Sequence, residues 1–182
     1  MMRRIRLAIV VGVAVAATAV GTAAMADGDQ SDSGSNDIQE RLTGYEETPL
    51  ALSTTGTGQF RARINQTGQQ ISYRLSYTAL EGDVQQAHIH FGAPAQIGGV
   101  SVFLCSNVGG PAGTQACPAA PGTVSGVIRP VDVIGPVPQG ITAGQFAELL
   151  AAIRAGATYV NVHSTLYPGG EIRAQLGDGH HH

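Results

Sequence analysis

The sequence predicts a mostly β domain: an antiparallel β-sandwich or barrel of the Greek-key type, with one short α-helix. Three observations lead to this fold class. Short segments alternate apolar and polar residues, turns rich in glycine, proline and asparagine separate them, and a single segment has the apolar spacing of a helix. Many short strands joined by turns are typical of sandwiches and barrels.

Seven segments are expected to form strands. The clearest is 70–77, where Ile71, Tyr73, Leu75 and Tyr77 fall on one face because side chains alternate along a strand. Segment 65–68 has the residues of a hairpin loop, and segment 167–170 has those of a tight turn. The expected strands are 57–64, 70–77, 84–91, 100–105, 123–128, 157–164 and 171–176.

One segment has helical periodicity. Its apolar stripe follows the spacing i, i+3, i+4, i+7, and it consists of Phe146, Leu149, Leu150 and Ile153. Thr142 with Gln145 three residues later resembles a capping box, and Gly156 stands where a helix often ends in glycine. We expect the stripe to pack against the core.

The domain organisation has four expected parts. Residues 1–26 resemble a signal peptide, with arginines before an apolar run of about 15 residues and the cleavage site Ala24-Met25-Ala26. That run is shorter than the roughly 20 residues a membrane span needs. Residues 27–37 are expected to be a disordered acidic Gly/Ser linker, 38–178 the β domain, and 179–182 a histidine tail, native or left from a purification tag.

Cleavage after Ala26 leaves 156 of the 182 residues, enough for one domain with a core. It removes three of the ten basic residues and none of the thirteen acidic ones, so 7 basic against 13 acidic residues give a charge of −6. The chain has no lysine. This balance argues against nucleic acid and against anionic membranes as partners. We expect the protein to be secreted, or held in the periplasm or cell envelope.

The mature chain has two cysteines, Cys105 and Cys117. In an exported protein an even number of cysteines usually forms disulfides, so we expect these two to be paired. A copper-thiolate role for Cys105 is the alternative, and it requires a thiol that escapes oxidation.

Outside the tail, two segments hold every histidine. His88 and His90 share one face of the strand 84–91, and His163 lies on a face of the strand 157–164 with Tyr159 and Asn161. Two histidines at i, i+2 with a third from a neighbouring strand can form a three-nitrogen site for copper or zinc. The alternative is that these histidines are hydrogen-bonded residues that tie the two strands together.

Two classes of metalloenzyme have sites related to this histidine set. The H-x-H pattern with a distant third histidine resembles the copper strands of Cu/Zn superoxide dismutases, but those enzymes need more histidines. A hydratase of the carbonic-anhydrase kind can use three histidines on zinc. A blue-copper site of the usual form lacks its methionine, because no methionine follows Met25. No nucleophile–base pair stands at a recognisable spacing, so we name no catalytic residue.

Further polar residues are candidates to orient the histidine ligands. Glu171 and Arg173 share one face of the last expected strand, and Asn161 lies on the face of His163. The alternative for Glu171 and Arg173 is an ion pair on the sheet surface. Glu47 is either a residue at the start of a strand or a partner of Arg173.

Three stretches together resemble the CHRD (chordin-type) domain family: Leu42-Thr43-Gly44-Tyr45-Glu46-Glu47-Thr48-Pro49, Ala87-His88-Ile89-His90, and Tyr159-Val160-Asn161-Val162-His163 through Pro168-Gly169-Gly170-Glu171-Ile172-Arg173. They cover residues 40–176, nearly the whole mature chain. The resemblance implies a secreted, single-domain, mostly β protein of the bacterial type.

These observations favour a binding module for copper or zinc at His88, His90 and His163 over an enzyme. A metalloenzyme with an open three-histidine site is the second hypothesis. A metal-free domain that binds another extracellular protein is the third, and the fold alone does not choose among them.

Overall fold

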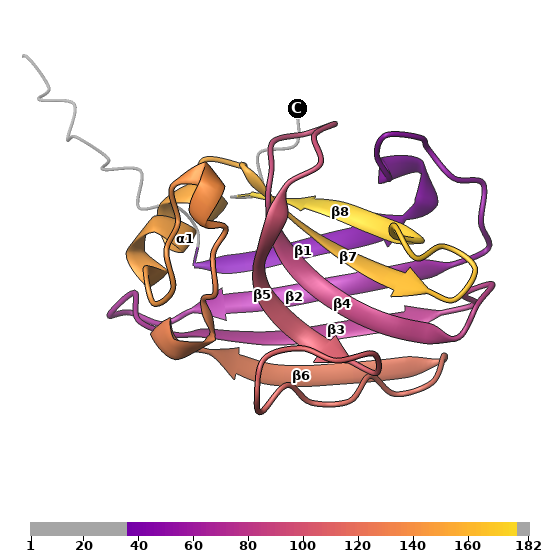
Figure 1. Ribbon diagram of the computed structural model, residues 1–182, viewed down its shortest axis with the longest axis horizontal. Coiled ribbons are helices and arrows are strands. Elements are labelled where there is room, and N and C mark those ends of the chain that lie inside the picture. Colours follow the sequence, from indigo (N-terminus) through magenta and orange to yellow (C-terminus); the bar gives the residue numbers. More distant parts are fainter. Residues whose placement is uncertain (1–35, 178–182) are drawn as a thin grey trace, which may run out of the picture. The chain divides into compact units, whose positions relative to one another are not determined.

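The computed structural model describes residues 36–177, which form one antiparallel sheet of eight strands and one α-helix (Figure 1). The predicted fold class is confirmed. The predicted signal peptide, most of the predicted linker and the histidine tail lie outside the described residues. The strands are β1 (Asp37–Thr43), β2 (Thr57–Ile64), β3 (Ile71–Thr78), β4 (Val84–Phe91), β5 (Gly99–Ser106), β6 (Gly122–Ile128), β7 (Thr158–Ser164) and β8 (Ile172–Leu176).

The strand order is β5-β4-β7-β8-β1-β2-β3-β6, and every pairing is antiparallel. Strands β1 to β3 follow one another as a meander, whereas β6 returns to pair with β3 and β7 returns to pair with β4. The sheet curls until its two end strands, β5 and β6, approach each other (Figure 1). The result is a nearly closed barrel of Greek-key type.

The gap between β5 and β6 carries no strand pairing, and the amide of Gln115 bridges it. This amide donates to the carbonyl of Leu104 on β5 at 3.1 Å and to the carbonyl of Ser125 on β6 at 3.2 Å. It also donates to the hydroxyl of Tyr73 at 2.8 Å. A single loop side chain therefore satisfies backbone carbonyls on both end strands.

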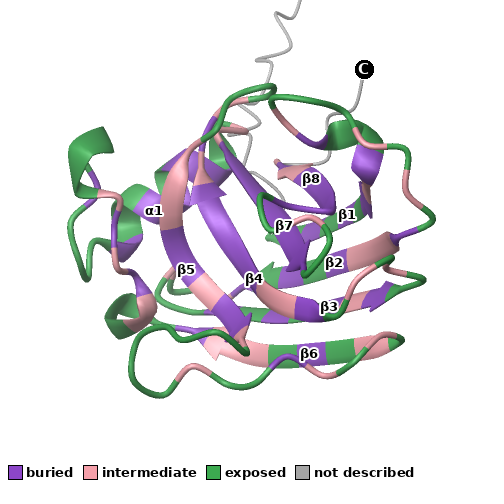
Figure 2. Cartoon of the chain, turned by 45° about the vertical axis from the view of Figure 1, so that its right-hand side comes forward, coloured by how far each residue is buried: buried purple, intermediate pink, exposed green. Residues whose placement is uncertain are grey.

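The barrel interior is the hydrophobic core, and strands β1, β2 and β3 alternate between buried and more exposed residues (Figure 2). On β3 the four predicted inward residues, Ile71 to Tyr77 in steps of two, are all buried. Strand β1 did not emerge from the sequence pattern. Its inward face holds Ile38 and Leu42 but also Glu40, which is only 7% exposed. A charged residue at an inward position hides the apolar alternation that marks a strand.

The predicted helix is α1 (Phe146–Arg154), and its four stripe residues are buried. The end of the helix matches the prediction, since Gly156 adopts the left-handed conformation with φ +63°. At its start only half of the capping box forms. The Gln145 side chain accepts from the backbone N–H of Thr142 at 2.6 Å, while Gln145 itself precedes the first helical residue. Short 3₁₀ turns η1 (Gly44–Glu46), η2 (Pro130–Asp132) and η3 (Val137–Gln139) complete the described elements.

Cys105 at the end of β5 and Cys117 in the following loop lie at disulfide distance, with 2.03 Å between the sulfurs. Asn107 adds hydrogen bonds to both backbone groups of Cys117. This cross-link fastens the loop that carries Gln115 to the end of β5. Among residues 36–177, no helix combines the length and the apolar character needed to cross a bilayer.

Candidate metal centre

The pairing of β4 with β7 brings the three histidines onto one face. His88 lies opposite Asn161, and His90 lies opposite Tyr159. His163 pairs with Gln86, the next position along the same face. The other face of these strands packs into the core, and β7 is buried on both faces along its whole length. The predicted sharing of one face by residues from both strands is therefore present.

Strand β4 is irregular at the histidines. Its register with β5 shifts between Ala87 and His88 and again between Ile89 and His90. Such bulges bend a strand, increase its twist and re-aim its side chains, and they are common beside functional sites. His88 and His90 therefore lie on a locally distorted strand.

The histidine side chains are close together and buried. His88, His90 and His163 are 2%, 8% and 6% exposed, and one ring nitrogen from each lies within 4.8 Å of the others. His88 Nδ1 and His163 Nε2 are 3.2 Å apart. Two nitrogens bound at 2.0–2.1 Å to one tetrahedral ion would be separated by about 3.3 Å. This separation suits a hydrogen bond between the two rings as well as two ligands of one ion.

Backbone carbonyls determine which ring nitrogen is available. His90 Nδ1 lies 2.9 Å from the carbonyl of Gly98, and His163 Nδ1 lies 3.0 Å from the carbonyl of Pro168. Because a carbonyl only accepts, each Nδ1 carries the proton and each Nε2 keeps a lone pair. This arrangement, in which a ligand histidine donates its other N–H to a carbonyl, is the usual one in metal sites.

Two ring nitrogens have no partner within the described part of the chain. His88 Nε2 and His90 Nε2 are both buried without a hydrogen bond. A buried polar atom left without a partner costs free energy, so such atoms are rare and often mark a functional group. A metal ion could bind to the free lone pair of His90 Nε2.

Burial keeps the three imidazoles neutral. It lowers the pKa of His88 to about 3, with a smaller contribution from the neighbouring His163 and His90. It lowers the pKa of His90 to about 4, although the hydrogen bond to Gly98 acts in the opposite direction. Burial also lowers the pKa of His163. At neutral pH all three rings are in the form that binds metal.

Aromatic rings and a guanidinium surround the histidines. Phe103 packs edge-on against His88 with ring centroids 4.3 Å apart. Tyr159 stacks on His90 at 4.7 Å, nearly parallel, and the guanidinium carbon of Arg173 lies 3.5 Å from the centre of the Tyr159 ring. The ring of His90, that of Tyr159 and the guanidinium of Arg173 thus form a stack on this face of the sheet.

The three residues predicted to support the ligands occupy different positions. Asn161 lies beside the histidines, where its amide raises the pKa of His90. Arg173 acts on His90 through Tyr159, and its guanidinium donates to the carbonyl of Gln96 at 2.9 Å. Glu171 instead accepts from the Thr54 hydroxyl at 2.8 Å and from the backbone N–H of Glu81 at 2.7 Å, so it fastens two loops.

Glu47, one of whose two expected roles was that of a partner of Arg173, is a buried carboxyl near Arg173. Burial raises its pKa to about 7, and the charge of Arg173 partly opposes the shift. Its oxygens lie close to Gly170, where an added Cβ would meet them at 2.6 and 2.7 Å and Asn161 Nδ2 at 2.8 Å. Phe103 was not predicted at this site. It carries no local signal, because it reaches His88 from β5, a segment distant in sequence from His163.

The comparison with protein families gives one match. The model of the CHRD domain matches residues 38–176, which include β1 in part and all the other strands. The comparisons with curated proteins and with solved structures give no match.

Proposed function

Because the chain belongs to the CHRD domain family, we propose that this member is an exported domain that binds one copper or zinc ion through His88, His90 and His163. The observation that carries the proposal is the set of three buried, neutral imidazoles with one ring nitrogen of each within 4.8 Å of the others. Two of these rings already donate their second nitrogen to a backbone carbonyl.

The ligand chemistry favours copper over zinc among divalent ions. Imidazole nitrogen suits both metals, and the Irving–Williams order places Cu²⁺ above Zn²⁺ at the same ligand set. Three nitrogens bound to one tetrahedral ion are about 3.3 Å apart. Because the ring nitrogens lie within 4.8 Å of one another, the most distant pair has to approach by up to about 1.5 Å when the ion binds.

The burial of the site favours retention of the ion over turnover of a substrate. All three ligand residues are at least nine-tenths buried, and aromatic rings pack against His88 and His90. A metalloenzyme would in addition need an open coordination position that substrate can reach. We therefore place a metal-binding domain ahead of chemistry of the superoxide-dismutase or hydratase kind, and ahead of a metal-free interaction domain.

Export is part of the proposal. Its support is the sequence of residues 1–26, together with Cys105 and Cys117 at disulfide distance, since such cross-links persist in oxidising compartments. Intact-mass measurement of the protein recovered from the culture medium or envelope should give a chain that begins at Asp27. A chain that retains residues 1–26 in the membrane fraction would contradict export by cleavage.

Calorimetric titration tests the metal site. The protein should have His180, His181 and His182 replaced by alanine, so that the tail cannot bind the ion. We expect one Cu²⁺ per chain, bound more tightly than Zn²⁺, and loss of binding in each of His88→Ala, His90→Ala and His163→Ala. Binding weaker than millimolar, or an unchanged affinity in the His163→Ala variant, would contradict the shared site.

A further inference from the structure

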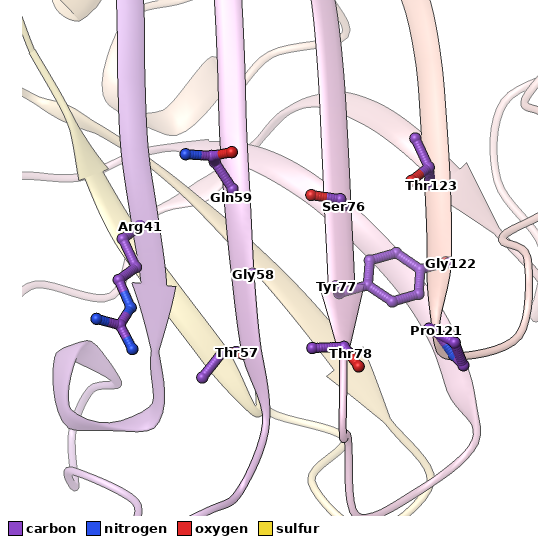
Figure 3. Close-up of a pocket in the computed structure, with 10 residues that line it drawn as sticks. All are labelled: Arg41, Thr57, Gly58, Gln59, Ser76, Tyr77, Thr78, Pro121, Gly122 and Thr123. Atoms are coloured by element: carbon purple, nitrogen blue, oxygen red, sulfur yellow. The ribbon is translucent and has the colours of Figure 1, made fainter.

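The outer face of β1, β2, β3 and β6 lies away from the core and carries almost only polar side chains. Its residues are those that alternate with the buried ones, and the strand registers place them in rows across the sheet. Figure 3 shows one row, which has a residue from each strand. The two central rows are Arg41–Gln59–Ser76–Thr123 and Gln39–Arg61–Arg74–Ser125.

This surface concentrates positive charge on an acidic protein. Seven basic residues follow residue 26, and four of them lie here: Arg41, Arg61, Arg63 and Arg74. We call this surface the arginine face. Its one acidic residue is Asp37, which forms an ion pair with Arg63 at 3.7 Å. The face therefore carries a net charge of +3, against −6 for residues 27–182.

The two central arginines are arranged unfavourably for the isolated domain. Arg61 and Arg74 lie directly opposite each other on neighbouring strands, and both are exposed. Like charges at directly opposed positions of a sheet are destabilising. Within the described residues, neither they nor Arg41 form an ion pair. Local arrangements that cost stability without compensation are expected at functional surfaces.

The arginine face is also hollowed in two places. One hollow of about 530 Å³ lies over the row of Arg41, and one of about 450 Å³ lies over Arg61, Arg63 and Arg74. The polar side chains that line the first hollow are those of Arg41, Thr57, Gln59, Ser76, Thr78 and Thr123. Guanidinium groups thus stand beside hydroxyl and amide groups along a continuous surface.

We infer that the arginine face binds an acidic polysaccharide, a polymer of sugars that carry carboxylate groups. Arginine pairs with carboxylates through two parallel hydrogen bonds, and the serine, threonine and glutamine side chains can bond sugar hydroxyls. The face lacks the buried aromatic anchors on which protein partners usually depend. Strands β1, β2 and β3 are each paired on both sides, so their edges are closed to an added peptide strand. The surface is separate from the histidine site, so either proposal can fail alone.

The test is calorimetric titration with polygalacturonate at low and high salt. Neutral dextran, polyglutamate and duplex DNA serve as comparison polymers. We expect the wild type to bind polygalacturonate, and added salt to weaken binding because it screens the charges. The double variant Arg61→Gln/Arg74→Gln should bind at least about tenfold more weakly, since each charged hydrogen bond is worth more than about 1.4 kcal/mol. Arg154→Gln, which removes a charge on α1, should bind like the wild type.

A stability measurement separates binding from a structural role. Arg74→Gln should melt at the same temperature as the wild type or above it, because it relieves the repulsion from Arg61. Equal binding by the double variant and the wild type, or no binding by the wild type, would overturn the proposal. Equally tight binding of polyglutamate or DNA would overturn the assignment to a polysaccharide. Binding that appears only after Asp27, Asp29 and Asp32 are changed to asparagine would also overturn the proposal. In that case the chain's own acidic segment would be the ligand that occupies the arginine face.

Discussion

His90 and His163 show how much of the candidate site is determined by single hydrogen bonds. Each ring donates Nδ1–H to a carbonyl of a loop, Gly98 or Pro168, and so directs Nε2 toward the other histidines. The strand pattern predicts that the three histidines share a face. It contains no information about these carbonyls, because their positions depend on how two loops fold back over the sheet.

Gly170 offers a specific test of the packing around Glu47 and Asn161. Its φ of +131° is unfavourable for other residues, and a Cβ there would lie within 2.8 Å of both side chains. We expect Gly170→Ala to lower the free energy of unfolding by about 1–3 kcal/mol and to weaken copper binding. The measurements are urea unfolding and copper titration.

The neighbouring Gly169 provides the control, since an added Cβ there meets nothing within 4 Å. Gly169→Ala should leave both quantities close to those of the wild type. Equal effects of the two substitutions would show that the close approach at Gly170 is without consequence.

Asn161 and Glu171 were both predicted to support the ligands, and the structure separates their contacts. Because Asn161 lies beside His90, Asn161→Ala should weaken copper binding by about 10- to 100-fold, the usual effect of removing a group that orients a ligand. Glu171→Gln should leave the affinity unchanged, because Glu171 contacts Thr54 and Glu81. A copper titration in which Glu171→Gln weakens binding and Asn161→Ala does not would contradict this assignment.

At the scale of elements, the sequence pattern identifies strands whose apolar residues alternate regularly. It misses β1, in which a charged residue interrupts the alternation. Strands β2 and β4 begin and end where the pattern predicts, and α1 contains its whole predicted stripe. Strand β1 was missed because the inward position between Ile38 and Leu42 holds Glu40. A periodicity analysis assigns inward positions from apolar side chains, so it does not recognise a buried charged residue as an inward one.

The bridge between β5 and β6 is an element-scale feature with a measurable contribution. Gln115→Ala removes the donor to Leu104 and Ser125, and it leaves two carbonyls without this partner. The Leu104 carbonyl keeps the Tyr73 hydroxyl as a donor and the contact to Ser125 is exposed, so we expect a loss of about 0.5–1.5 kcal/mol in the free energy of unfolding and faster amide exchange at the ends of β5 and β6. Gln66→Ala, an exposed substitution in the β2–β3 turn, should change neither quantity. Unchanged exchange in Gln115→Ala would show that the strands hold together without the bridge.

For the whole molecule, the buried histidines make stability depend on pH. In the folded state the pKa values of His88 and His90 are about 3 and 4, and that of His163 is lowered, whereas the ordinary value is 6.5. Between these limits the unfolded chain binds protons that the folded domain does not. The contribution of the histidines is therefore complete above pH 6.5 and is lost as the pH falls toward 4.

Glu47 acts in the opposite direction. Its folded pKa of about 7 lies above the ordinary 4.5, so the folded domain holds one proton more in this range. Two protons from His88 and His90 less one from Glu47 leave a net of one, which corresponds to roughly 1.4 kcal/mol of lost stability per pH unit below about 6, and the lowered pKa of His163 adds to this loss. Urea unfolding of the metal-free protein at pH 7, 6 and 5 measures this slope. A free energy of unfolding that stays constant over this range would contradict the neutral, buried state of the rings.

The central claim is that His88, His90 and His163 hold one metal ion, and anomalous diffraction from crystals grown with Cu²⁺ or Zn²⁺ tests it most directly. The protein should again have alanine at positions 180–182. We expect a single anomalous peak between β4 and β7, with one nitrogen of each histidine about 2.0–2.1 Å away when the ion is zinc. A histidine cluster without an anomalous peak, in crystals grown with saturating metal, would contradict the claim.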